Sequence, residues 1–68
     1  MIRLQNADSG RGILVSPAFI VMAEKGDPSG AYVTIHYGTN NFTIRVRESL
    51  DEIERMTRSY FWETAAHG

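Results

Sequence analysis

The sequence contains no cysteine, and His36 and His67 are its only histidines. Without cysteine the chain can form neither a disulfide nor a thiolate metal site. Neither histidine lies beside a carboxylate in a pattern typical of zinc ligation. We therefore expect no structural metal and no other cofactor.

A chain of 68 residues forms one domain at most. It buries a smaller fraction of its surface than a larger protein does, so its net stability is small. Small domains without a disulfide or a metal often gain stability by association. The sequence therefore favours a homo-oligomer, or a chain that docks on a protein partner.

An excess of either charge and a long apolar run are also missing. Seven basic and eight acidic residues leave a formal net charge of −1, whereas polyanion binders normally show a basic excess. The longest apolar run, residues 18–23, is too short to span a bilayer. Residues 1–5 lack the apolar segment of a secretory signal, so we expect a cytoplasmic protein without membrane contact.

Two segments, residues 32–37 and 42–47, show the period-two alternation of half-buried strands. The residues expected to face inward are Val33, Ile35, Tyr37, Phe42, Ile44 and Val46. A four-residue loop over 38–41 would place Tyr37 opposite Phe42 and Val33 opposite Val46. Every inward pair would then be apolar, and a one-residue slip would mix the two faces.

Upstream, Ile2 and Leu4 alternate in a first strand, and a loop with two glycines joins it to a second strand over 13–15. Pro17 cannot donate a ladder hydrogen bond, so the chain should break there. Residues 19–24 are apolar without alternation, which is typical of a central strand covered on both sides or of a strand in an oligomer interface.

A helix is predicted to begin after Ser49, because Ser49 and Glu52 have the spacing of a capping box. One apolar stripe follows at helical spacing and should face the core: Leu50, Ile53, Met56 or Thr57, Tyr60 and Phe61. The helix should end near residue 62 or 63, leaving a frayed tail over 64–68. The predicted fold is therefore α+β, a single domain over residues 1–63 with a four- or five-stranded antiparallel sheet packed by one C-terminal helix.

Catalysis is not expected. The predicted neighbours of His36 are Thr34, Thr43 and Arg45, which offer neither a convincing nucleophile nor a carboxylate within reach. The glycine-rich loop over 8–12 runs into a strand, whereas a phosphate loop runs into a helix N-terminus.

Two surfaces are candidates for binding. Three consecutive aromatic residues on a helix cannot all face the core, so Trp62, with Phe19 or Met22, could mark an oligomer or partner interface; alternatively, Trp62 covers one end of the sheet. The outer sheet face carries Tyr32, His36, Arg45 and Arg47. This aromatic–basic mix is used by single-stranded nucleic-acid binders, but a solvated sheet face has a similar composition.

The order of these elements resembles a known family. Val15-Ser16-Pro17-Ala18-Phe19-Ile20 precedes a hairpin that ends in Ile44-Arg45-Val46-Arg47-Glu48-Ser49, and Leu50-Asp51-Glu52-Ile53 then opens the helix. Over residues 1–60 this layout resembles the small FlbD-like proteins of flagellar gene clusters and short uncharacterised proteins, several of them viral. The resemblance implies a fold, and it transfers no catalytic residue.

The sequence therefore predicts a small non-enzymatic protein–protein interaction module: an oligomer, or an accessory, adaptor or inhibitor bound to a larger protein. A virus-encoded inhibitor is one concrete version. The alternative is a nucleic-acid-binding module that uses the outer sheet face.

Overall fold

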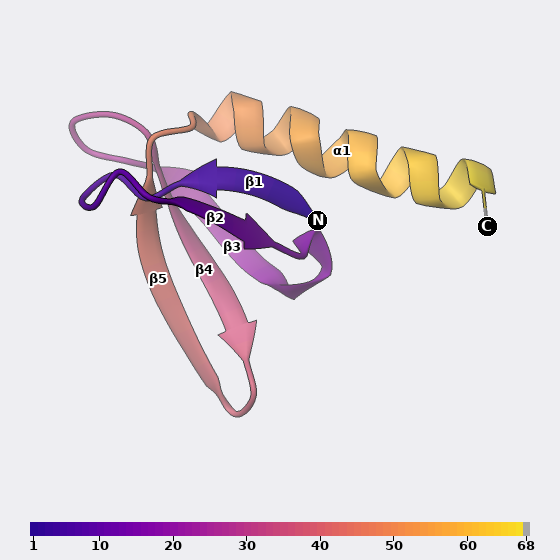
Figure 1. The fold of residues 1–68 in the computed structure, drawn as a ribbon, viewed down its shortest axis with the longest axis horizontal. Helices are drawn as coiled ribbons and strands as arrows, with labels where there is room; N and C mark the ends of the chain where they lie inside the picture. The colour runs from indigo at the N-terminus through magenta and orange to yellow at the C-terminus, as the bar shows by residue number, and fades with distance from the viewer. Residues whose placement is uncertain (68) are drawn as a thin grey trace.

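The computed structural model describes residues 1–67, and the side chains of residues 1–62, as two small antiparallel sheets and one C-terminal helix (Figure 1). The elements are β1 (Ile2–Gln5), β2 (Gly12–Val15), the 3₁₀ helix η1 (Pro17–Phe19), β3 (Ile20–Lys25), β4 (Ala31–Tyr37), β5 (Asn40–Val46) and α1 (Leu50–His67). One sheet pairs β1 with β2, and the other has the order β3-β4-β5. The α+β class and the antiparallel pairing are confirmed, whereas the single sheet of four or five strands is not found.

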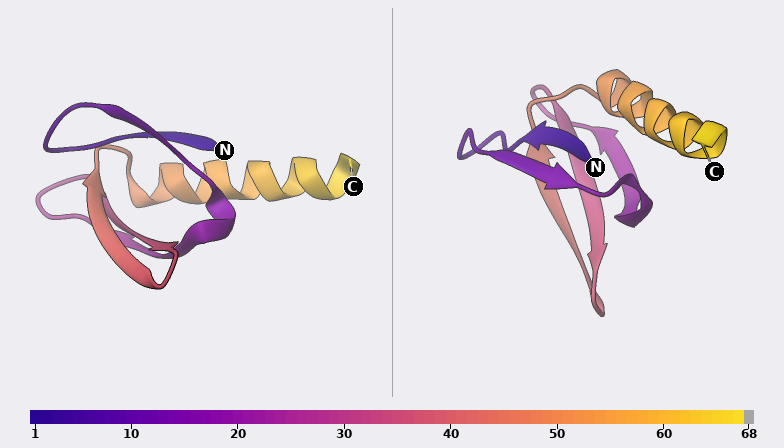
Figure 2. Two further views of the ribbon diagram at one scale, coloured as in Figure 1. Left: turned by 60° about the horizontal axis from the view of Figure 1, so that its bottom comes forward. Right: turned by 45° about the vertical axis from the view of Figure 1, so that its right-hand side comes forward.

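The two sheets are joined at one corner. The backbone N–H of Arg47 donates to the carbonyl of Gln5, and the N–H of Ala7 donates to the carbonyl of Arg45, both at 2.8 Å. An isolated bridge between Asn6 and Val46 lies at the same place. From this corner the sheets diverge, as Figure 2 shows, so that β1 and β2 lie over one face of the other sheet.

The β4–β5 hairpin has a different register from the predicted one. Its turn contains two residues, Gly38 and Thr39, and Tyr37 pairs with Asn40. Gly38 has a φ of 63°, which a two-residue hairpin turn requires at its first position and which glycine adopts without strain. The strands are therefore shifted by two residues from the prediction, and the assignment of side chains to faces survives because the shift is even.

The core lies between the two sheets and is closed at one side by α1. Its buried residues are Ile2, Leu4, Val15, Ala31, Val33, Ile35, Val46 and Ile53. We predicted that the helix would cover the inward face of the hairpin; the β1–β2 sheet covers most of it instead. Tyr37 and Phe42 lie beyond that cover near the tip of the hairpin, so the prediction that they are buried is wrong, and Tyr37 is 72% exposed.

Helix α1 begins as predicted, because the backbone N–H of Glu52 donates to Ser49 Oγ at 3.1 Å. Ile53 is buried, and Met56 and Tyr60 pack against the core. The helix continues to His67, past the predicted end near residue 62, because no glycine or proline interrupts it before Gly68. Its C-terminal half extends beyond both sheets (Figure 1).

Strand β3 is an edge strand, so the first of the two alternatives predicted for residues 19–24, a central strand covered on both sides, is wrong. It pairs with β4 on one side, and the pairing is irregular between Ile20 and Met22. Val21 and Met22 are exposed. Residues 20–23 of this run therefore lie at the surface beside α1, where Ile20 and Ala23 also pack against the core.

Candidate interaction surface

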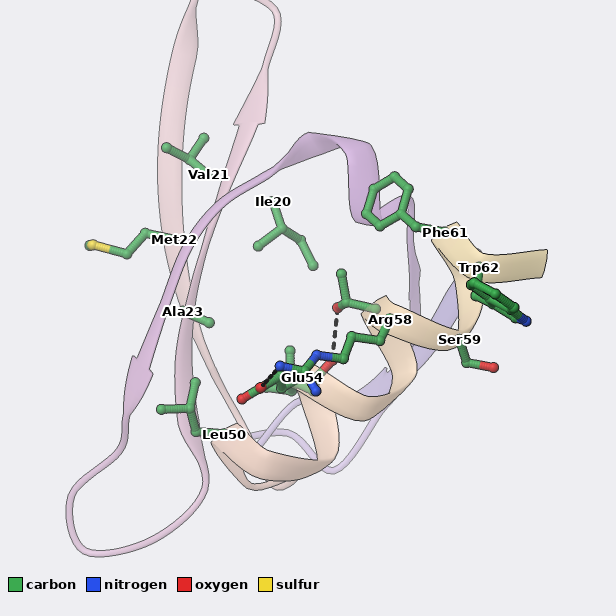
Figure 3. Close-up of a pocket in the computed structure, with 12 residues that line it drawn as sticks. Ile20, Val21, Met22, Ala23, Leu50, Glu54, Arg58, Ser59, Phe61 and Trp62 are labelled. Carbon is green, nitrogen blue, oxygen red and sulfur yellow. Dashed lines mark hydrogen bonds and ion pairs between the residues drawn. The ribbon is translucent and has the colours of Figure 1, made fainter. Parts of the chain in front are cut away.

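An apolar groove runs between the edge strand β3 and helix α1 (Figure 3). It has a volume of about 1010 Å³. Strand β3 contributes Ile20, Val21, Met22 and Ala23, and α1 contributes Leu50, Ile53, Glu54, Thr57, Arg58, Ser59, Phe61 and Trp62. We call this surface the β3–α1 groove. Its volume is at the upper limit of small-molecule clefts, and its open form suits a macromolecular partner better.

The groove exists because α1 carries two apolar stripes. One stripe, centred on Ile53, Met56 and Tyr60, packs on the core. The other includes Leu50 and Phe61 and faces the space beside β3. The helical spacing predicted a single stripe that held both sets of residues, so the prediction that Phe61 packs in the core is wrong. Phe61 is 46% exposed.

Trp62 is the most exposed large apolar residue of the groove, at 75%. Tyr60 and Phe61 form an edge-to-face pair with ring centroids 5.3 Å apart, a favourable arrangement. The structure therefore places two of the predicted interface residues, Trp62 and Met22, in the lining of one groove. Phe19 lies outside it.

Three polar side chains of the groove lining, Glu54, Thr57 and Arg58, already have partners. Arg58 Nη2 lies 2.8 Å from Glu54 Oε1 in an i,i+4 ion pair, and Thr57 Oγ1 donates to the carbonyl of Ile53 at 2.7 Å. Both interactions are drawn in Figure 3. The groove can therefore be covered by an apolar surface without leaving these hydroxyl and charged groups unpaired.

Phe19 belongs to a second apolar surface, which we call the hairpin cleft. The cleft lies between the β1–β2 sheet and the tip of the β4–β5 hairpin, and its volume is about 430 Å³. Its lining includes Leu14, Phe19, Tyr37 and Phe42. The rings of Tyr37 and Phe42 pack at a centroid distance of 6.3 Å.

The outer sheet face is more polar than the two apolar surfaces. Tyr32 lies opposite Arg45 on β5. The predicted register, which differs by two residues, would have placed it opposite Arg47. Arg45 Nη2 lies 3.4 Å from Asp8 Oδ1, which reduces the local positive charge.

Another predicted residue of this face has a neutral partner. His36 Nδ1 lies 2.7 Å from Asn41 Oδ1. Arg47 follows the end of β5 at Val46, so the ladder does not align it with the other three residues. Two of the four residues proposed for nucleic-acid binding therefore have a partner within the chain, Arg45 with Asp8 and His36 with Asn41.

The described part of the chain holds no group of three or more metal-ligating side chains. Among the same residues, no helix combines the length and hydropathy needed to cross a bilayer. Comparisons with family models, curated proteins and solved structures give no match for this chain.

Val21, Leu50 and Phe61 are groove residues that sequence reasoning did not assign to a binding surface. For Leu50 one available signal was its place in a row with Glu54, Arg58 and Trp62, in which each residue lies beside the next on the helix surface. For Val21 there was no comparable signal, because its exposure follows from β3 being at the sheet edge.

Proposed function

We propose that this protein is a small non-enzymatic protein–protein interaction module, and that the β3–α1 groove is its contact surface. The observation that carries the proposal is the exposed apolar lining contributed by both β3 and α1. Trp62, of a residue type enriched at interface hot spots, lies at one end of the lining, and Ile20 and Ala23 of β3 point toward α1 from the opposite wall (Figure 3).

The size of the molecular surface supports this proposal. A monomeric globular protein of 7.6 kDa is expected to expose roughly 4300 Å², whereas this chain exposes 4970 Å². Its radius of gyration is 11.9 Å, against roughly 10.9 Å for a compact domain of this length. The projecting half of α1 accounts for this shape, and a partner seated in the groove would pack against that half.

Replacing Trp62 by Ala tests the proposal. We expect Trp62→Ala to weaken self-association or partner binding at least tenfold, because a buried hot-spot tryptophan contributes about 2 kcal/mol or more. Light scattering measures self-association, and calorimetric titration measures binding to a partner recovered with the wild-type chain.

The matched control is Leu14→Ala, which removes an exposed apolar side chain from the hairpin cleft. It should leave the same association unchanged. Far-UV circular dichroism must show that both variants are folded. Loss of the fold in Trp62→Ala would make Trp62 a structural residue and would contradict the proposal.

A further inference from the structure

Strand β3 has a ladder neighbour on one side only, namely β4. Just beyond its end, the backbone N–H of Gly26 donates across the hairpin to the carbonyl of Gly30 at 3.0 Å. The backbone groups of successive residues point to opposite sides of an antiparallel strand. Those of Glu24 therefore also face β4, whereas those of Ala23 and Lys25 face the open side.

These outward backbone groups indicate what kind of chain can cover them. In the described part of the protein, no hydrogen bond outside the ladders involves the backbone of Ala23 or Lys25. A helix uses its own N–H and C=O groups internally, so a helix placed over this edge would leave the strand's groups unpaired, at a cost in free energy. An added strand supplies both a donor and an acceptor to each of them.

The open edge of β3 lies along the β3–α1 groove. The side chains of Ala23 and Ile20 point toward α1, with Leu50 at the Ala23 end of the helix wall and Phe61 at the Ile20 end (Figure 3). Residues directly opposite each other on paired strands have their side chains on the same face. Every second side chain of an added strand would therefore enter the groove.

The helix wall determines the chemistry of those side chains. Its charged pair and its threonine hydroxyl are already satisfied within the chain, so the wall selects apolar groups. The distance from Leu50 to Phe61 along the helix is about 17 Å, which about five residues of extended chain also span. Two or three inward side chains therefore fill the groove.

Lys25 adds a requirement at one end. Its side chain is exposed and lies on the same face as that of Ala23, two residues earlier. Neither ion pair of the described residues includes it. A lysine on an edge strand disfavours indiscriminate pairing, whereas an acidic residue directly opposite would make the pairing favourable.

We propose that the occupant of the β3–α1 groove is an extended segment of a partner protein, which adds to β3 as an antiparallel fourth strand. Its apolar side chains alternate and face α1, and an acidic side chain lies opposite Lys25. This inference rests on the proposed function and gives the partner's chemistry.

A second copy of β3 fits this edge less well. In an antiparallel pair of β3 strands, the residue opposite Lys25 must also point its backbone groups outward. In the regular part of the strand, Ala23 and Lys25 of the second copy meet this condition, and Glu24 does not. Self-pairing would therefore leave the lysine without an acid, or would oppose two lysines.

Selection from a displayed library of random nine-residue peptides tests the chemistry. We expect the enriched peptides to alternate apolar and polar residues, with an acid two positions before the first apolar residue, because an antiparallel segment begins at the Lys25 end. No enrichment, or enriched apolar residues at helical spacing, would overturn the inference.

N-methylation of an enriched peptide tests the backbone pairing directly. The amides of its inward residues face β3, since Ala23 has both an inward side chain and outward backbone groups. Methylating those amides should weaken binding at least tenfold, because hydrogen bonds are lost and the methyl groups obstruct the approach. Methylating the intervening amides is the matched control and should change binding less than twofold. Equal effects in calorimetric titration would contradict strand addition.

Lys25→Glu tests the charge requirement. It should weaken binding of the acidic peptide about two- to tenfold, because an attractive cross-strand pair becomes repulsive. Arg55→Glu makes the same charge change on α1 outside the groove lining and should leave binding unchanged. Equal weakening in both variants would show that net charge, rather than a residue opposite Lys25, determines the preference.

Hydrogen exchange separates the possible occupants of the edge. The Ala23 and Lys25 amides should exchange rapidly in the dilute wild-type protein and slowly with the peptide bound. Protection that appears in the protein alone as its concentration rises would show that a second copy pairs there, and would overturn the proposed partner. If peptides of helical spacing bind and Trp62→Ala weakens them, the proposed function stands and only strand addition fails.

Discussion

Two valines on neighbouring strands of one sheet have opposite environments. Val33 on β4 is fully buried, whereas Val21 on β3 is 59% exposed. The β1–β2 sheet covers the centre of the three-stranded sheet, and nothing in the described part of the chain covers Val21. Burial in this protein therefore depends on which strand has a covering layer, and similar side chains build a closed core on one side and an open groove on the other.

Helix α1 contributes residues to both the closed core and the open groove. Ile53 is 3% exposed and joins the core, while Trp62 belongs to the open side. Substitutions on the closed side should therefore change the free energy of unfolding, and substitutions on the open side should change association.

The largest effect is expected on the closed side, at Gly30. This glycine has a φ of 75°, and a Cβ at this position would collide with the carbonyl oxygen of Val46. Gly30→Ala should cost about 3 kcal/mol or more through backbone strain and steric overlap, and urea unfolding measures this loss. Gly38→Ala is the control, because its Cβ would meet no other atom within 4 Å and only the strain of its φ would remain; equal losses at both positions would argue against the clash.

The next effect concerns the core-facing side of α1. Ile53→Ala should lower the free energy of unfolding by about 2–4 kcal/mol, because it removes buried methyl groups and leaves a cavity. Leu50→Ala on the groove side should cost less in the monomer, since Leu50 is only partly buried. Equal losses in thermal or urea unfolding would show that the two stripes are not distinct.

A smaller effect is expected at the start of the helix, which both sides share. Ser49→Ala removes the acceptor for the Glu52 amide and should cost about 1 kcal/mol. Ser49→Asp keeps an acceptor and should retain most of the stability. A loss as large in Ser49→Asp as in Ser49→Ala would show that the cap does not determine this helix start.

The smallest effect on the folded monomer is expected on the open side. Trp62→Ala should change the free energy of unfolding by no more than about 0.5 kcal/mol, measured at a dilution where association does not contribute. Its effect should appear in association instead. A loss of several kcal/mol in the dilute monomer would mean that Trp62 packs against the core and would remove the contrast between the two sides.

The sequence predicted the individual strands and the helix better than it predicted which element packs over which. Alternation placed the hairpin strands and assigned their faces, and the Ser49–Glu52 spacing located the helix start. The register could not be resolved, because pairings that differ by two residues both keep apolar side chains on one face. The two-residue turn was decided by the backbone of Gly38.

The candidate surface was only partly predictable for the same reason. Three adjacent aromatics implied that Trp62 leaves the core stripe, and the structure places it in the groove lining with Met22. Whether the run over 19–24 lies at the centre or the edge of a sheet depends on long-range pairing, which alternation does not encode. Phe19 was separated from the other two by the turn of η1 at Pro17.

Trp62 is the single tryptophan of the chain and stands outside the core. Its fluorescence emission should therefore shift to shorter wavelength when the groove is filled, and should respond weakly when the core melts. The protein thus carries an intrinsic optical reporter for occupancy of this surface, and a dilution series followed at one emission wavelength would give the dissociation constant without an added dye.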